Sequence, residues 1–317
     1  MTFKAISISS FSFNKASSFS ISVSDIVQKA VLYCSVVDQY VTAKEIIENK
    51  DPLVDLASFQ PLDELSEADK SSFLQRLSIS NSDFQKLFER FKALSTFDQK
   101  YAEKSYEGNS KVRLGVFERL LKMLTRLPDH IGIAYFEGYR PLSKQKEYFD
   151  QKFIEIFNQE LKKTQSTIST FSEEALDHFL EMIYELTTTH VSPFINNTPT
   201  HSTGAAIDIH LYDTNTNELL DIGKFDVIFG ENTEQQAFAS HLSIEKQKNR
   251  VMLFQAAAES GFAIYGNEWW HISYGDKVWA FVYNEPFAHY GYVSSNEPIV
   301  NLTKKDYLKS MKTKLKA

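Results

Sequence analysis

Two short segments of this 317-residue chain hold polar side chains that packing alone does not explain. The first, THSTGAAID, contains His201 and Asp208; the second, EWWH, contains Glu268 and His271. A catalytic zinc site uses three nitrogen or oxygen ligands and leaves one position for water. It also needs a nearby base to accept the proton of that water. His201, Asp208 and His271 would supply the ligands, and Glu268 would supply the base.

The spacing within each segment requires a bend in the backbone. Side chains alternate between the two faces of a strand, so residues three or seven positions apart face opposite ways. A glycine lies between His201 and Asp208, and a Gly-Asn turn signal precedes Glu268. We therefore expect Asp208 on a strand and His271 at the start of another, with Glu268 on the loop before it.

Each of these residues also has an ordinary interpretation. His201 alone suits a loop, and Asp208 alone suits the solvent-facing side of a strand. Glu268 and His271 suit a surface pair that flanks packed tryptophans. Residue types and spacing leave both interpretations open. We interpret His210, on the same strand face as Asp208, as a residue at the rim of the site rather than a partner of a ligand.

Hydrophobic periodicity predicts the elements that must position these segments. Strands are expected in IGIAYFE, AAIDIHLYD, FAIY and WWHISYG. Helices are expected over most of 25–94 and over 110–127, 143–163, 172–187 and 246–260, and the lysine-rich tail suits a solvated helix. This order predicts an α+β fold, in which helices flank a small antiparallel sheet that carries the site and the additional N-terminal region is mostly helical.

Composition limits the possible classes of function. A net charge of −7 and a pI of about 5.7 give no support for a nucleic-acid partner. The single Cys34 excludes an internal disulfide and a cysteine-rich metal cluster, and no apolar run approaches the about 18 residues of a membrane helix. The Ser/Phe-rich residues 1–24 lack the continuous apolar core of a secretory signal. A cytoplasmic location is therefore the default expectation, with export by another route left open.

HSTGAAID followed by EWWH resembles the HxxGxAxD and ExWH pattern of the zinc D,D-peptidases and dipeptidases that act on peptidoglycan. The D-alanyl-D-alanine dipeptidases of the vancomycin-resistance type are the most similar branch, because EGYRP, DIGKFD and NRVMLFQAAAESGF also resemble it in the same order. The resemblance covers roughly residues 111–283. It implies a metallopeptidase with one Zn²⁺ ion, held by His201, Asp208 and His271, with Glu268 as the general base.

The resemblance also gives roles to two further residues. Arg140 of GYRP matches an arginine that stabilises the transition state, and Asp226 of KFD falls where an acid binds the free amino group of the substrate. The alternative for Arg140 is a surface cation at a helix start, where the helix dipole would repel it. The alternative for Asp226 is a helix cap, and the sequence does not decide between the two.

The expected function is zinc-dependent hydrolysis of D-Ala-D-Ala or a similar D-amino-acid dipeptide. The alternatives are a D,D-carboxypeptidase or L,D-endopeptidase acting on larger cell-wall peptides and, in another class, a non-catalytic zinc-containing binding module. The predicted organisation is an N-terminal segment (1–24), a helical extension (25–105), a catalytic domain (106–290) and a basic tail (291–317). The extension would serve as a lid, an oligomerisation region or a partner-binding domain, and the oligomeric state stays open.

Overall fold

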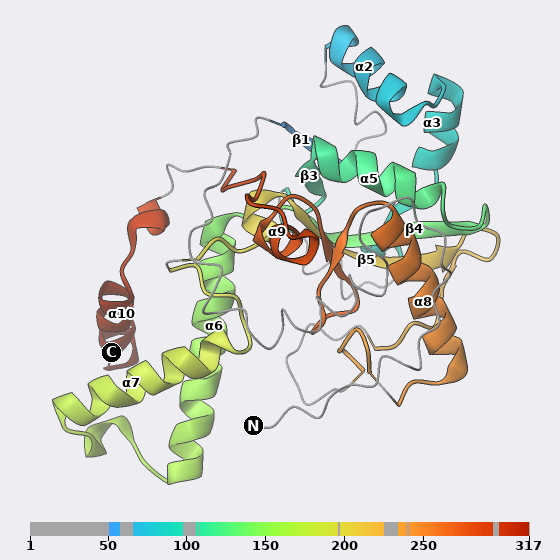
Figure 1. Cartoon of the computed structure of the whole chain (residues 1–317). Coiled ribbons are helices and arrows are strands. Elements are labelled where there is room, and N and C mark those ends of the chain that lie inside the picture. The colour runs from blue at the N-terminus through green and yellow to red at the C-terminus, as the bar shows by residue number, and fades with distance from the viewer. Residues whose placement is uncertain are drawn as a thin grey trace. The chain divides into compact units, whose positions relative to one another are not determined.

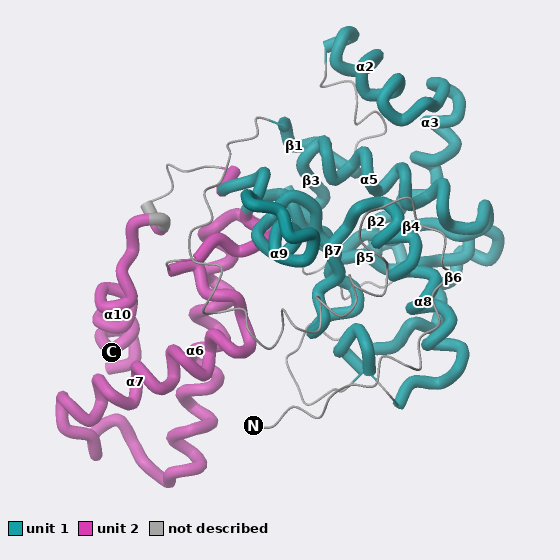
Figure 2. The backbone as a smooth tube through the Cα atoms, viewed as in Figure 1, with its two compact units in different colours: residues 1–139, 203–291 teal, residues 140–202, 292–317 magenta. Residues whose placement is uncertain are grey.

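A computed structural model shows the fold of the chain (Figure 1), and it describes residues 51–57, 66–97, 106, 108–195, 197–224, 234–239, 241–293 and 298–316. Contacts between Cα atoms divide the chain into two compact units (Figure 2). Unit 1 comprises residues 1–139 and 203–291, and unit 2 comprises residues 140–202 and 292–317. The segment 1–24 and the helical region predicted from residue 25 to 50 lie outside the described residues.

Unit 1 is built on a six-stranded sheet in the order β2-β4-β5-β8-β7, with β6 also paired to β5. Its strands are β2 (Phe91–Ala93), β4 (Ile131–Glu137), β5 (Ala206–Asp213), β6 (Glu218–Leu219), β7 (Ala263–Ile264) and β8 (His271–Ser273). A separate antiparallel pair joins β1 (Leu53–Asp55) to β3 (Lys111–Arg113). The predicted α+β class is confirmed, although β2 runs parallel to β4 while the other pairs are antiparallel.

Most helices of unit 1 begin at residues whose side chains cap them. They are α2 (Glu67–Leu77), α3 (Asn81–Phe88), α5 (Leu114–Leu124), α8 (Ile244–Glu259) and α9 (Lys277–Tyr283), with a short 3-10 helix η2 (Leu94–Thr96). Serine hydroxyls accept a backbone N–H at the start of α2, α3 and α8. Such caps satisfy amide groups that have no partner within the helix.

One face of the sheet forms the core of unit 1. Ile207, Ile209 and Leu211 alternate along β5 and are fully buried in one hydrophobic cluster with residues of α5 and α8. Because neighbouring side chains on a strand point to opposite faces, Asp208 and His210 lie on the other face. The alternation read from the sequence therefore places the candidate ligand away from the apolar core.

Unit 2 consists of helices alone within its described residues. They are α6 (Leu142–Thr164), η3 (Ile168–Thr170), α7 (Glu173–Thr188), η5 (Pro298–Asn301) and α10 (Lys304–Lys316). The tail was expected to be solvated, but Tyr307 and Met311 of α10 are buried at 1% and 2% exposure. These two residues are four positions apart, so they form one apolar stripe that packs while the lysines occupy the rest of the helix surface.

Three short elements differ from the sequence prediction. Residues 111–113 form β3 where a helix was expected to begin at 110, because they pair with β1. Residues 91–93 form β2 within the region expected to be helical. The last site strand contains only His271–Ser273, since Trp269 and Trp270 lie in a turn that the His271 amide closes on the Glu268 carbonyl. Among the described helices, none is long and apolar enough to cross a membrane.

Candidate metal centre and active site

Two adjacent strands position Asp208 and His271. The two residues are direct register partners in the antiparallel pair β5–β8, so their side chains leave the same face of the sheet. Oδ1 of Asp208 lies 3.1 Å from Nδ1 of His271, and both side chains are buried. Two backbone ladders therefore fix two of the three predicted ligands opposite each other.

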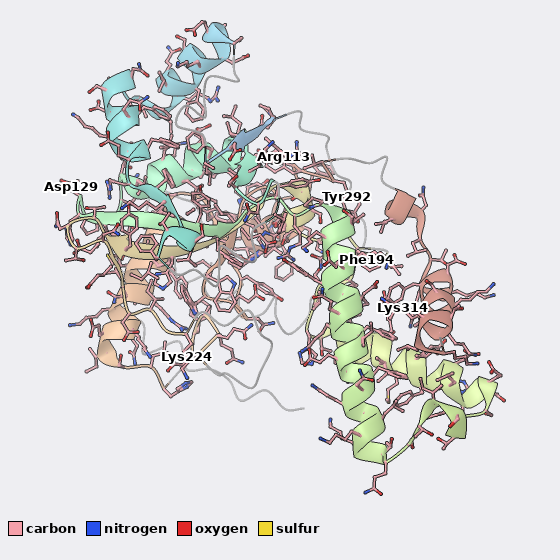
Figure 3. The ribbon with its side chains drawn as sticks, turned by 180° about the vertical axis from the view of Figure 1, so that it is seen from behind. Arg113, Asp129, Phe194, Lys224, Tyr292 and Lys314 are labelled. Carbon is pink, nitrogen blue, oxygen red and sulfur yellow. The ribbon has the colours of Figure 1, made fainter. Side chains whose placement is uncertain are left out.

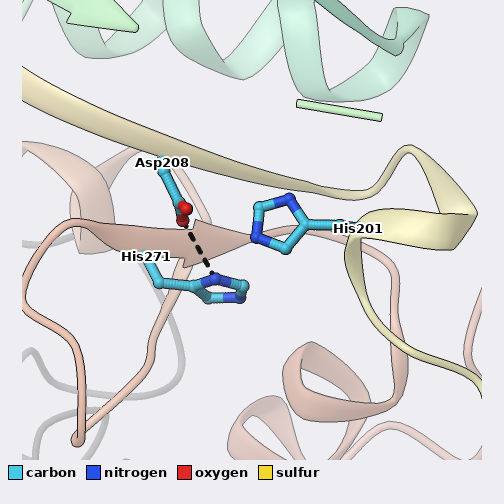
Figure 4. A group of neighbouring side chains, drawn as sticks. All are labelled: His201, Asp208 and His271. Carbon is cyan, nitrogen blue, oxygen red and sulfur yellow. Dashed lines mark ion pairs between the residues drawn. The ribbon is translucent and has the colours of Figure 1, made fainter. Parts of the chain in front are cut away.

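His201 comes from the 3-10 turn η4 (His201–Thr203), which precedes β5. Gly204 follows this turn with φ +71°, a conformation that residues with a Cβ rarely adopt. The predicted bend between His201 and Asp208 is therefore present. In Figure 4 the imidazole of His201 points towards the Asp208 carboxylate and the His271 ring.

The three residues form a group whose chemistry suits a metal ion. Each offers one ligand atom, and these atoms lie within 4.8 Å of one another. Two ligands of one zinc ion span about 4 Å at most, since each lies about 2 Å from the ion. The 4.8 Å bound exceeds that limit by less than 1 Å, and two imidazole nitrogens with one carboxylate oxygen are donors that zinc accepts. The buried group His201, Asp208 and His271 can therefore hold a metal ion.

Glu268 lies beside this group but is more open to solvent. It sits in the turn between β7 and β8, where its amide donates to the Tyr265 carbonyl at 3.3 Å and its carbonyl accepts from the His271 amide at 3.2 Å. Its Oε2 lies 3.9 Å from Nδ1 of His271. The side chain is 23% exposed, against 6% for that of His271. The Glu268 carboxylate therefore lies at the edge of the group with access to solvent.

The two tryptophans of EWWH belong to the hydrophobic core. Trp269 and Trp270 are buried and meet edge to face, with ring centroids 5.5 Å apart. The Trp269 ring also meets His210 edge to face at 5.0 Å. His210 is only 4% exposed, and burial lowers its pKa to about 4. The interpretation of His210 as a rim residue is therefore wrong, because its ring is buried against Trp269 and not open to solvent.

Arg140 is half-buried and held in place by α6. Its Nη1 donates to Oε1 of Gln145 at 2.7 Å, and its guanidinium lies 5.0 Å from the centroid of the Tyr148 ring. Its backbone amide donates to the carbonyl of His201 at 3.1 Å, which joins the GYRP segment to the turn that carries His201. Arg140 is therefore not a free surface cation at the helix start.

Sequence reasoning missed Gln145, which holds Arg140. Gln145 is fully buried, and its Nε2 donates to the Ser192 carbonyl at 2.6 Å. The available signal was a polar residue between Leu142 and Phe149 on the buried stripe of α6. The second predicted substrate residue, Asp226, lies outside the described residues.

Known proteins share this part of the chain. The Peptidase_M15 family model, described as D-ala-D-ala dipeptidase, matches residues 132–292. The D-alanyl-D-alanine dipeptidase of Synechocystis sp. is 30% identical over 209 residues, which cover 59% of this chain and 82% of that relative. The chain belongs to the D-Ala-D-Ala dipeptidase family. It is therefore a peptidase.

A second member of the dipeptidase family extends the comparison. The D-alanyl-D-alanine dipeptidase of Enterococcus faecium is 28% identical over 147 residues, covering 46% of this chain and 63% of that relative. The residues matched by the family model run from β4 to the loop after α9, and they contain the buried His-Asp-His group, Glu268 and Arg140. β1, α2, α3, β2, β3 and α5 precede the matched residues, and α10 follows them.

Proposed function

We propose that this family member is a zinc-dependent dipeptidase that hydrolyses D-Ala-D-Ala or a similar D-amino-acid dipeptide, with its catalytic domain over residues 106–290. The observation that carries the proposal is the buried His201, Asp208 and His271 group with Glu268 at its edge. Both relatives are D-alanyl-D-alanine dipeptidases, which supports this substrate class.

His201, Asp208 and His271 would hold one zinc ion through two imidazoles and one carboxylate. When bound, zinc supplies a Lewis acid that polarises the scissile carbonyl and lowers the pKa of a water molecule towards neutrality. The 3.1 Å approach of Asp208 to His271 supports this assignment, because the two donor atoms already lie within the separation of two ligands of one ion.

Glu268 would act as the general base and then as the general acid. It takes the proton of the attacking water as the oxygen–carbon bond forms, and delivers it to the amine nitrogen as the carbon–nitrogen bond breaks. Its partial exposure supports this role, since a carboxylate that exchanges protons needs access to water. The 3.9 Å between its Oε2 and Nδ1 of His271 supports this role, because the carboxylate lies beside the proposed ligands.

Arg140 would stabilise the negative charge that develops on the carbonyl oxygen of the substrate. A guanidinium fixed in advance costs little reorganisation when that charge appears. The hydrogen bond from Nη1 to Gln145 and the Tyr148 ring supply this fixation. Asp226 would bind the ammonium group of the substrate, which favours a free dipeptide over the end of a longer peptide.

Chelation of the metal tests this proposal. We expect the purified protein to contain one zinc ion per chain and to release D-Ala from D-Ala-D-Ala. A chelator should abolish hydrolysis and added zinc should restore it. The three proposed ligands are neutral or anionic side chains, and none of them can replace the metal ion as a Lewis acid.

A panel of substrates separates the alternatives. Free D-Ala-D-Ala should be cleaved faster than muropeptides that end in the same two residues. Hydrolysis of the muropeptides alone would favour the carboxypeptidase or endopeptidase alternative. Zinc binding without hydrolysis of either class would leave the non-catalytic binding module.

A further inference from the structure

The short strand β3 contacts both segments that carry the proposed catalytic groups. On one edge it pairs with β1. On the other, the Arg113 amide donates to the Gly204 carbonyl at 2.8 Å, and the Lys111 carbonyl accepts from the Tyr139 amide at 2.6 Å. Gly204 follows the turn of His201, and Tyr139 precedes Arg140 in the chain. β3 is therefore hydrogen-bonded to the backbone beside both segments.

The side chain of Arg113 adds a second set of bonds to the same region (Figure 3 labels this residue). Its Nε donates to the Thr203 carbonyl at 2.8 Å, and its Nη1 donates to the Asp51 carbonyl at 2.8 Å. Its Nη2 lies 3.5 Å from the Gly291 carbonyl. The planar guanidinium carries several N–H donors in a fixed arrangement, so one residue holds three segments that are distant in sequence.

The turn that Arg113 contacts has little room to move. Thr203 is buried, and its Oγ1 accepts from the Ala205 amide at 3.1 Å. A Cβ on Gly204 would lie 2.6 Å from Cδ2 of Leu53 in β1, so β1 packs directly on the backbone after the turn. Because the backbone is confined on these sides, the position from which the His201 side chain extends is fixed.

We propose that Arg113 is a positioning residue for the metal centre: it fixes the turn from which His201 reaches Asp208 and His271. The inference rests on the proposed function only in taking this group as the metal site. Arg113 and its partner Asp51 both precede the residues matched by the family model. The region before that match therefore serves the site by supporting a ligand, in addition to any role as a lid or binding region.

Zinc affinity of Arg113 variants tests the inference. Loss of a residue that orients a ligand typically weakens metal binding about 10- to 100-fold. We expect Arg113→Ala to lose affinity in this range and Arg113→Lys to lose less, since lysine keeps the charge and one donor direction. Affinity is measured by competition with a chromogenic chelator. The visible spectrum of the cobalt-loaded protein reports the ligand geometry independently of hydrolysis.

Arg90 offers a matched control. It is also half-buried, and it donates from Nε to the Ile131 carbonyl at 3.0 Å and from Nη2 to the Pro128 carbonyl at 2.7 Å, beside β2 and β4. Arg90→Ala should lower the unfolding temperature yet leave zinc affinity within about twofold and the cobalt spectrum unchanged, because its bonds do not reach a ligand segment.

Each outcome decides a different statement. Zinc affinity and a cobalt spectrum equal to wild type in folded Arg113→Ala would overturn the positioning role while leaving the metal centre intact. If Arg113→Ala does not fold, the same comparison in Arg113→Lys decides. Equal losses in the Arg113 and Arg90 variants would show a general stability effect and would also overturn the inference. A wild-type protein that binds no zinc would instead overturn the proposed metal centre, and this inference with it.

Discussion

The residues of the site differ in exposure in a way that matches the roles proposed for them. His201, Asp208 and His271 are each 5% exposed, whereas the Glu268 side chain is 23% exposed. Burial strengthens the interaction of fixed donors with a cation, because few water molecules compete for it. A proton-transferring carboxylate needs the opposite environment, with access to water and to the leaving amine.

Replacement of Arg140 tests the transition-state assignment. Arg140→Ala should lower kcat by about 100- to 1,000-fold, as does the loss of other donors to a developing oxyanion. KM should change little, because the interaction strengthens only as the charge develops. Steady-state kinetics with D-Ala-D-Ala measures both constants.

A charge-matched control lies on α6, the helix that begins just after Arg140. Lys163 is 68% exposed near the end of α6, and Lys163→Ala should leave kcat unchanged. A rise in KM at constant kcat in Arg140→Ala would assign Arg140 to substrate binding instead of transition-state stabilisation.

The grouping of His201, Asp208 and His271 was predictable from the sequence, because each lies in a compact motif with a local bend. Gln145 and Arg113 were not, since their roles depend on carbonyl groups far away in the chain. Gln145 donates to Ser192, 47 positions later, and Arg113 donates to Thr203, 90 positions later. Such contacts leave no periodic pattern in the local sequence. Their acceptors are backbone carbonyls, which every residue has, so residue types do not reveal them either.

At the scale of elements, α10 shows how a lysine-rich tail can still be part of a core. Tyr307 meets Phe149 of α6 at 5.7 Å and Tyr184 of α7 at 5.8 Å, both edge to face. Lys312 of the same helix forms ion pairs with Glu173 and Asp177 of α7. Exposed pairs of this kind contribute little, so the buried ring carries most of the attachment of α10.

Truncation of this ring tests the packing of α10. Tyr307→Ala should lower the free energy of unfolding of unit 2 by about 3 kcal/mol, the scale of other large aromatic-to-alanine changes. Lys309→Ala, on the exposed surface of the same helix, should change it by less than about 0.5 kcal/mol. Urea unfolding followed by circular dichroism measures both. A loss below about 1 kcal/mol in Tyr307→Ala would contradict the packing described for α10.

Long elements agreed with the sequence, whereas several short ones did not. α6, α7 and α8 each carry enough turns for a helical repeat to be visible, and β5 alternates over eight residues. β1 and β2 have three residues each, and only their distant partners β3 and β4 define them. Strand formation at this length depends on tertiary context more than on local preference.

At the scale of the whole molecule, the region before the family match is part of the core of unit 1. Phe73 of α2 stacks on Phe117 of α5 at 5.7 Å, and Phe84 of α3 meets the same ring edge to face at 6.1 Å. These rings belong to the hydrophobic cluster that includes β5. The described part of the extension therefore contributes to folding of the sheet that carries Asp208 and His271.

Acid should destabilise unit 1 in part through His289. Burial lowers the pKa of His289 below its ordinary value of 6.5, and Arg119 adds to this, while Glu285 and Asp51 oppose it. The unfolded chain then binds a proton more readily than the folded chain, so the stability contribution is present above pH 6.5 and is lost as the pH falls through the folded pKa.

Unfolding of His289→Asn across pH measures this contribution. The difference in unfolding free energy between wild type and His289→Asn should shrink from pH 7.5 to pH 5. A single fully buried group can change this difference by about 1.4 kcal/mol per pH unit. The change for His289 should be smaller, because His289 is only partly shielded from water. A difference that stays constant or grows as the pH falls would contradict the sign of the effect.

Hydrolysis and zinc content of Glu268→Gln, measured on the same samples, test the central claim most directly. The account predicts one zinc ion per chain in both proteins and a rate on D-Ala-D-Ala lowered by about 100- to 10,000-fold, the range for loss of a general base. Glu181→Gln, the same change on an exposed face of α7, should leave the rate unchanged. A Glu268→Gln protein that retains its zinc and cleaves D-Ala-D-Ala as fast as wild type would contradict the account.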